Sequence, residues 1–230
     1  MICRIADLLV SVPEAGGMAP RCREYLTEET SAVDVEIRQE TYEPERWPGL
    51  DWDRMCYMES GEIFYLKLLR YNGMMLHASA VEYEGNVYLF SGPCGVGKST
   101  HTAQWQKTFG LSARIINDDK PALRYVDGRW YAYGTPWCGK SGINENRRAP
   151  IAGICFLKQA EENRIRKLEP AEVVGRLLPQ TLHKFWSAET MDLLLERMEA
   201  LIRDVPFYEM ENIPGPEAVQ LSYSTMCPRK

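Results

Sequence analysis

The strongest constraint on how this 230-residue chain folds is an uninterrupted glycine motif at residues 92–99. The stretch reads GPCGVGKS and matches the pattern G-x-x-x-x-G-K-[ST]. The apolar residues VYLF lead into it, and the run STHTAQWQKTFG continues from it to Gly110. This order predicts a strand, a glycine turn and a helix that ends at Gly110, which is the local arrangement of an α/β protein.

The spacing of this motif suits the binding of nucleotide phosphates. Glycines let consecutive main-chain N–H groups turn toward phosphate oxygens, and the start of the following helix adds its positive dipole end. Lys98 would reach the β- and γ-phosphates, and the Ser99 hydroxyl would ligate Mg²⁺. The predicted nucleotide-binding residues are Gly92, Pro93, Cys94, Gly95, Val96, Gly97, Lys98, Ser99 and Thr100.

Two adjacent acids, Asp118 and Asp119, end a later apolar strand that begins near Ser112. A nucleotide with magnesium needs a carboxylate near its metal, and either acid could supply it. The second acid would then be free to accept a proton from an attacking hydroxyl. The alternative is one metal ligand beside one solvated acid at the strand end.

The remaining chain divides into two predicted regions. Residues 1–60 alternate short apolar runs with connections rich in Gly and Pro, which indicates strands and loops with little helix. Residues 61–230 are predicted to form the catalytic domain, beginning with a helix over residues 61–73 that ends at Gly73. Ile63, Leu66 and Leu69 would form its apolar face.

Further elements are predicted within residues 61–230. Two strands flank a turn at residues 84–86, and a hairpin turns at Asp127-Gly128. The tail over residues 163–230 is expected to be mostly helical, with Ser187 as an N-cap. Its apolar stripe, which is expected to be core, is Met191, Leu194, Leu195, Met198 and Leu201. Histidines 101 and 183 are expected to be structural.

Composition narrows the possible functions. Hydrophobic residues make up 45% of the chain and charged residues 26%, which is typical of a packed globular protein. The formal charge of −5 argues against a general nucleic-acid binder. The chain contains no run of about 18 apolar residues, so no membrane span is predicted. The seven scattered cysteines and the short apolar N-terminal stretch favour reduced thiols and a cytoplasmic protein.

The combination LHASAV, VYLFSGPCGVGKST and INDD resembles the HPr kinase/phosphorylase family and, more distantly, the phosphoenolpyruvate carboxykinases. The resemblance covers about residues 74–158, and it is closest to short HPr-kinase-like proteins that also carry a GTPWCGK-like segment. It implies an α/β fold with the mixed-sheet P-loop core of these families and a helical C-terminal tail. The arginine-containing signature loop of HPr kinases is missing, so HPr itself is not the expected acceptor.

The resemblance also implies roles for individual residues. Asp118 and Asp119 would bind metal and act as general base, with Lys98 as a catalytic cation and His77 supporting the base. Residues 134–146 would form a loop over the site, with Lys140, Asn144 and Asn146 near the substrate. Trp137 in this loop would either stack on a ligand or anchor the loop.

The predicted activity is therefore a Mg²⁺-dependent transfer of phosphate to a serine-like hydroxyl. ATP is the expected donor, with ADP or pyrophosphate as alternatives, and the acceptor would be a protein, a peptide or an amino acid. No nucleic-acid or membrane partner is expected, and a homo-oligomer is possible. Two alternatives stay open at this point: a nucleotide-binding sensor without phosphotransfer, and an ATPase coupled to motion or assembly.

Overall fold

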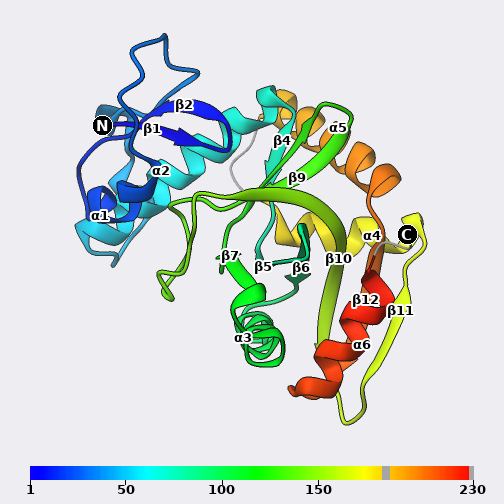
Figure 1. Ribbon diagram of the computed structural model, residues 1–230. Coiled ribbons are helices and arrows are strands. Elements are labelled where there is room, and N and C mark those ends of the chain that lie inside the picture. Colours follow the sequence, from blue (N-terminus) through cyan, green and yellow to red (C-terminus); the bar gives the residue numbers. More distant parts are fainter. Residues whose placement is uncertain (183–186, 228–230) are drawn as a thin grey trace.

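The structure is a computed structural model that describes residues 1–182 and 187–227. It combines a curled nine-stranded mixed sheet with flanking helices and a small three-stranded sheet at the N-terminus (Figure 1). The mixed α/β class predicted from the glycine motif is confirmed. His183 lies outside the described residues. None of the described helices is both long enough and apolar enough to cross a membrane.

The N-terminal segment forms the small sheet and a short helix. Strands β1 (Ile2–Ile5) and β2 (Leu8–Ser11) pair antiparallel, and β3 (Val35–Glu36) pairs parallel with β2. Helix α1 (Met18–Cys22) follows the glycine pair Gly16-Gly17, and tight 3₁₀ turns follow at Arg23–Tyr25, Gln39–Thr41 and Pro44–Arg46. The core of this segment is continuous with that of the main domain, because it includes Tyr133 and Trp137.

Helix α2 (Trp52–Leu68) begins within the region that the sequence predicts to be strands and loops, so that prediction is wrong for residues 52–60. Asp51 caps the helix by accepting a hydrogen bond from the Arg54 amide at 2.8 Å. The helix buries charged residues as well as apolar ones, including Glu59 and Glu62. Arg46 pairs with Glu62, and burial with a partner is what lets a carboxylate occupy a core position. These buried acids hide the helical periodicity.

The end of α2 also differs from its prediction. The helix stops at Leu68 and tightens into a 3₁₀ turn at Leu69–Tyr71, and the left-handed residue that closes it is Asn72 at φ 55°. Gly73 instead starts the next strand. The buried apolar face consists of Phe64, Tyr65, Leu68 and Leu69, whereas Ile63 and Leu66 are only half-buried.

The main sheet is built mostly from antiparallel neighbours around one long curved strand, β10 (Arg148–Gln159). Its order is β4-β8-β9-β10-β6-β5-β7, and β12 pairs with both β10 and β11. The strand bounds are Gly73–Met75 (β4), Ala78–Tyr83 (β5), Asn86–Ser91 (β6), Arg114–Asn117 (β7), Ala122–Val126 (β8), Arg129–Tyr133 (β9), Arg164–Lys167 (β11) and Phe207–Asn212 (β12). The β5–β6 hairpin and the β8–β9 hairpin, with its tip at Asp127-Gly128, are both confirmed.

The C-terminal tail is less helical than the sequence predicts. Helices α4 (Pro170–Leu177), α5 (Ala188–Asp204) and α6 (Pro216–Met226) are joined by β11 and β12, and β12 extends the main sheet beside β10. Ser187 caps α5 as predicted. Leu194, Met198 and Leu201 are buried, but Leu195 is 45% exposed and does not belong to the core face.

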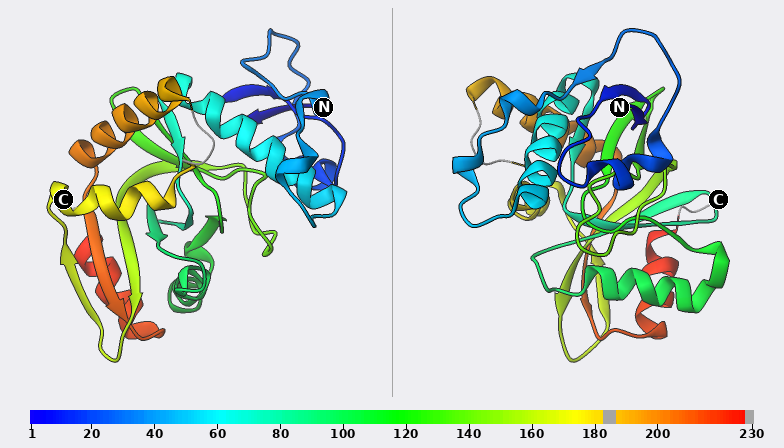
Figure 2. Two further views of the ribbon diagram at one scale, coloured as in Figure 1. Left: turned by 180° about the vertical axis from the view of Figure 1, so that it is seen from behind. Right: turned by 90° about the vertical axis from the view of Figure 1, so that its left-hand side faces the viewer.

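Helix α3 (Lys98–Phe109) follows the glycine motif and ends at Gly110, as predicted. It packs against α6, so that α6 covers its side opposite to the N-terminal segment (Figure 2). The contact is aromatic: Trp105 lies between Tyr88 of β6 and Tyr223 of α6 at ring distances of 4.8 and 5.9 Å. This packing fixes the orientation of α3 relative to the sheet.

His101 lies within this aromatic core, which confirms a structural environment for it. Its Nε2 accepts a hydrogen bond from the Trp105 indole at 3.2 Å, and burial lowers the pKa of His101 from 6.5 to about 4. Protonation would therefore favour the unfolded chain. We expect roughly 3 kcal/mol of the free energy of unfolding to be lost as the pH falls from 6.5 to 4.

Urea unfolding across this pH range measures the effect, with His101→Gln as the comparison. The variant cannot take up the proton, so its stability should fall less steeply than that of the wild type as the pH drops. Equal slopes for the two proteins would contradict a buried neutral histidine.

Candidate functional site

Strand directions bring the sequence-predicted residues together at one edge of the sheet. Strand β5 is antiparallel to both β6 and β7, so β6 and β7 run the same way. The glycine motif follows β6 and the acid pair follows β7 at this edge, where β5 begins immediately after His77. His77 thus lies in the link between β4 and β5.

The loop over residues 92–97, here called the glycine loop, has the main-chain conformation that its glycines permit. Gly92, Gly95 and Gly97 have φ angles of 137°, 81° and 107°, which are strained for other residues. A Cβ atom at Gly92 would approach the Leu157 carbonyl oxygen of β10 to 3.2 Å. Gly95 and Gly97 have no other atoms within 4 Å of such a position, so open space lies beside them.

Lys98 lies at the start of α3 and is 9% exposed. Its Nζ donates hydrogen bonds to the Gly92 and Pro93 carbonyl oxygens, at 2.8 and 3.1 Å. Burial lowers the pKa of Lys98, although Asp118 and Asp119 act in the opposite direction. The ammonium is thus held against the loop by main-chain oxygens that a bound phosphate could replace.

Asn117 holds the acid pair in position. Its side-chain oxygen accepts hydrogen bonds from the main-chain N–H groups of Asp119 and Lys120, at 3.0 and 2.8 Å. Its amide nitrogen donates to the main-chain oxygen and the hydroxyl of Thr135, at 3.0 and 3.1 Å. The fully buried Asn117 therefore fixes the turn after β7 and ties it to the loop over residues 134–146.

Asp118 is connected to the first turn of α3. Ser79 of β5 donates a hydrogen bond to its Oδ1 at 2.6 Å, and the same hydroxyl contacts Thr102 Oγ1 at 2.7 Å. Because the single Ser79 proton is used on Asp118, Thr102 of α3 is the donor in this contact. This chain of hydroxyls keeps Asp118 on the side of the site that carries the glycine loop.

Asp119 lies in a different environment, among cationic and phenolic groups. Lys120 forms an ion pair with Oδ2, His77 Nε2 lies 3.4 Å from Oδ1, and the Tyr57 hydroxyl lies 3.5 Å from Oδ2. Burial by itself disfavours the carboxylate, but His77 and Lys120 outweigh it and lower the pKa of Asp119 to about 2. Asp119 is therefore ionised throughout the physiological range.

Three residues that the sequence analysis did not select complete the site: Tyr57, Lys120 and Arg21. The Tyr57 hydroxyl accepts hydrogen bonds from Gly139 N at 2.8 Å and from Lys120 Nζ at 3.3 Å. Arg21 lies over the Tyr57 ring, 4.7 Å from its centroid. The position of Lys120 directly after the acid pair was a usable signal. Tyr57 and Arg21 carry no motif that would indicate them.

These groups surround a cavity of about 1080 Å³. One wall is the glycine loop with the start of α3, and the floor holds His77 and the acid pair. The opposite wall comes from the N-terminal segment, α2 and the loop over residues 139–141. Its lining includes Gly16, Gly17, Arg21, Leu50, Asp53, Arg54, Tyr57, Met58, Gly139, Lys140 and Ser141.

Only some of the other predicted site residues line this cavity. Cys94, Ser99, Thr100 and Lys140 line this cavity, whereas Pro93 and Val96 line a neighbouring hollow beside β10. Asn144 and Asn146 do not line the cavity: their side-chain amides donate to the main-chain oxygens of Thr135 and Glu24, at 3.0 and 3.1 Å.

Trp137 is fully buried and anchors its loop. Its ring stacks on Phe64 of α2 at 4.8 Å, and its indole donates to Ser60 at 3.1 Å. Gly61 permits this contact, since a Cβ atom there would approach the indole ring to 2.9 Å. Of the two roles considered from the sequence, the structure therefore favours the anchor.

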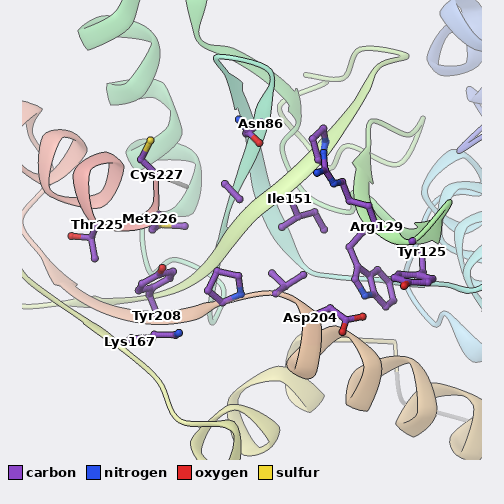
Figure 3. Close-up of a pocket in the computed structure, with 16 residues that line it drawn as sticks. Asn86, Tyr125, Arg129, Ile151, Lys167, Asp204, Tyr208, Thr225, Met226 and Cys227 are labelled. Atoms are coloured by element: carbon purple, nitrogen blue, oxygen red, sulfur yellow. The ribbon is translucent and has the colours of Figure 1, made fainter. Parts of the chain in front are cut away.

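A second cavity, of about 760 Å³, lies near the opposite end of the sheet, where β6 begins at Asn86 (Figure 3). Its labelled side chains come from the six strands β6, β8, β9, β10, β11 and β12, from α5, and from α6 and the residue after it, and they include Arg129, Ile151, Tyr208 and Cys227. None of the glycine loop, the acid pair or His77 lines it. The 1080 Å³ cavity is therefore the candidate site.

No family model matches the sequence. No curated protein matches it. Among solved structures, the fold is similar to that of the HPr(Ser) kinase/phosphatase from Coxiella burnetii, which is 12% identical in sequence. The similarity covers 66% of this chain and 92% of that chain, with a TM-score of 0.38.

Proposed function

We propose that this protein is a Mg²⁺-dependent phosphotransferase that transfers phosphate from a nucleotide to a serine-like hydroxyl. The observation that carries the proposal is the meeting of the glycine loop, Lys98 and two differently placed carboxylates at one cavity. A phosphate cradle alone would support binding. An additional ionised carboxylate, held away from the glycine loop among its own partners, supports transfer to an acceptor.

The donor half of the proposed site is the glycine loop with the first turn of α3. The open space beside Gly95 and Gly97 and the partly buried ammonium of Lys98 suit a polyphosphate. The hydroxyl of Ser99 and the carboxylate of Asp118 are oxygen donors of the kind that Mg²⁺ takes alongside phosphates and water. When bound, the ion would neutralise phosphate charge.

The two acids would have separate tasks. Asp118 is tied through Ser79 and Thr102 to α3, the helix that carries Ser99, so it is the proposed metal ligand. Asp119 faces Tyr57 of the opposite wall, so it is the proposed partner of the acceptor hydroxyl. A carboxylate with a pKa of about 2 is a weak base. It would mainly orient the hydroxyl and take its proton late, as a loose phosphoryl-transfer transition state allows.

Lys120 and His77 would support Asp119. Tyr57 and Asp119 raise the pKa of Lys120 against the opposing effect of burial, so its ammonium is retained. Together the two side chains keep the Asp119 carboxylate ionised and restrict its orientation. Lys120 also adds positive charge to the cavity in which the phosphoryl group would move.

The second candidate is a nucleotide-binding sensor that performs no transfer. Binding requires the glycine loop, Lys98 and one metal-binding acid, which the donor half already provides. The arrangement of Asp119, Lys120, His77 and Tyr57 favours the transferase, because it contributes nothing obvious to nucleotide binding.

Incubation of the purified protein with labelled ATP and Mg²⁺ tests the proposal. Free serine, serine-containing peptides, and proteins encoded near this one form the acceptor panel, with ADP release followed in parallel. Label transfer to a hydroxyl, with ADP release that depends on the acceptor, would support the transferase. Tight ATP binding without acceptor-dependent release would favour the sensor.

Cys94 provides an independent test of the donor half. It is exposed within the glycine loop and lines the cavity, whereas Cys3, Cys22, Cys56, Cys138 and Cys155 are buried. Alkylation with iodoacetamide should add bulk where the phosphates would lie and abolish nucleotide binding. Calorimetric titration with MgATP measures the loss, and Cys94→Ser should bind nucleotide and resist the reagent. Unchanged binding by fully alkylated protein would contradict this placement of the phosphates.

A further inference from the structure

The wall opposite the glycine loop contains an arginine with spare hydrogen-bonding capacity. Arg21 Nη1 donates to the Gly139 carbonyl oxygen at 3.4 Å and contacts Cys138 Sγ at 3.6 Å. Within the described part of the chain no carboxylate lies within ion-pairing distance of Arg21, whereas most other arginines there have such a partner. A guanidinium has five N–H donors, so most of those of Arg21 have no partner among residues 1–182 and 187–227.

The position of this guanidinium is fixed by its surroundings. Its carbon lies 4.7 Å from the centroid of the Tyr57 ring, and Tyr57 contacts Gly139, Lys120 and Asp119 through its hydroxyl. Arg21 is half-buried and lines the 1080 Å³ cavity. A cation held in this way by an aromatic face and one main-chain oxygen is preorganised for an anion.

The cations on the two walls of the cavity are placed for different ligands. Lys98 and Ser99 line the cavity from the start of α3, whereas Arg21 and Lys140 line it from α1 and the loop over residues 139–141. Lys140 is exposed and, among the described residues, has no ion-pair partner within reach. Arg54 is 3.6 Å from Asp51, and Asp53 is the carboxylate of this wall, which limits the negative charge that it would accept.

We propose that this wall is the acceptor subsite and that it selects an acceptor carrying a single carboxylate near its hydroxyl, with Arg21 binding the carboxylate. The inference rests on the proposed function, because it assigns the acceptor end of the same cavity. Arg21 would hold the carboxylate through paired N–H donors while the hydroxyl of the acceptor lies at Asp119. Leu50 and Met58 offer apolar contact for the carbon skeleton.

A binding measurement tests this without requiring turnover. Ligand-observed NMR of the MgADP-loaded protein compares 3-hydroxypropanoate with the neutral 3-hydroxypropanamide. The carboxylate should bind more tightly, and Arg21→Gln should weaken its binding by about tenfold or more. The exposed Arg23, which does not line the cavity, is the matched control, and Arg23→Gln should bind both probes like the wild type.

Several outcomes overturn the inference. It fails if the two probes bind equally, if neither binds, or if Arg21→Gln leaves the preference for the carboxylate intact. It also fails if Arg21→Gln weakens MgATP binding as much as carboxylate binding, since Arg21 would then serve the donor. A second arm compares peptides with serine beside glutamate or glutamine, which distinguishes an acidic peptide from a small hydroxy acid.

Failure of the proposed function is a separate result. If the protein binds 3-hydroxypropanoate through Arg21 but transfers no phosphate to any acceptor, the proposed subsite stands and the proposed transferase activity fails. If the protein phosphorylates charged and neutral acceptors equally, the proposed transferase activity stands and the proposed subsite fails.

Discussion

Lys98→Ala is expected to reduce phosphoryl transfer by about a thousandfold or more, which is the scale of losing a positioned cation from a transferring phosphoryl group. The ammonium is held at the glycine loop by two main-chain carbonyl oxygens. An alanine there cannot neutralise the charge that develops on the phosphates. Initial rates with saturating acceptor, followed by ADP release, measure the effect.

Lys107→Ala provides the matched control for this variant. Lys107 lies on the same helix, α3, and is exposed at the end remote from the glycine loop. Its replacement should leave both transfer and stability unchanged. Circular dichroism should show that Lys98→Ala is folded, and wild-type turnover by the folded variant would exclude the proposed donor site.

Asp119→Asn is expected to reduce transfer by about 10²- to 10⁴-fold while leaving MgATP binding nearly unchanged. An amide cannot take the proton of the acceptor hydroxyl, and Asp118 remains available for the metal. The contrast between lost transfer and retained binding separates the two acids. Single-turnover kinetics and calorimetric titration with MgATP supply the two measurements.

The same substitution removes the ion-pair partner of Lys120, so some stability should be lost as well. Asp127→Asn is the matched control, because it makes the same chemical change at the exposed tip of the β8–β9 hairpin. Asn accepts the left-handed conformation of that turn. A variant Asp119→Asn that transfers at the wild-type rate, or that loses nucleotide binding and transfer together, would contradict the division of roles between the acids.

Local sequence patterns predicted the parts of the site that are continuous in the chain. The strand before the glycine loop, the helix to Gly110 and the strand that ends at the acid pair are all found in the structure. Each of these depends on neighbouring residues: glycines at positive φ, apolar alternation, and an end signal. The same reasoning placed the tip of the β8–β9 hairpin at Asp127-Gly128 correctly.

Local sequence patterns gave wrong secondary structure where the burial of a residue depends on partners outside its own helix or strand. Helix α2 was missed over residues 52–60 because the buried face of this part includes Glu59, which the Trp47 indole satisfies. Strands β11 and β12 were missed in a tail that reads as helical. The family resemblance implied Asn144 and Asn146 near the substrate, but their side-chain amides donate to main-chain oxygens of Thr135 and Glu24.

The sequence alone encodes the glycine loop and the helix that follows it, since both lie within one short, continuous stretch. It also determined that two acids would follow a buried strand. The folded structure was needed to separate the two acids, because it pairs Asp118 with Ser79 and Asp119 with Tyr57 and Lys120. It alone brought Arg21 to the opposite wall. The reason is physical: contacts between the N-terminal segment and the main sheet arise from packing between distant elements, which leaves no local periodicity to read.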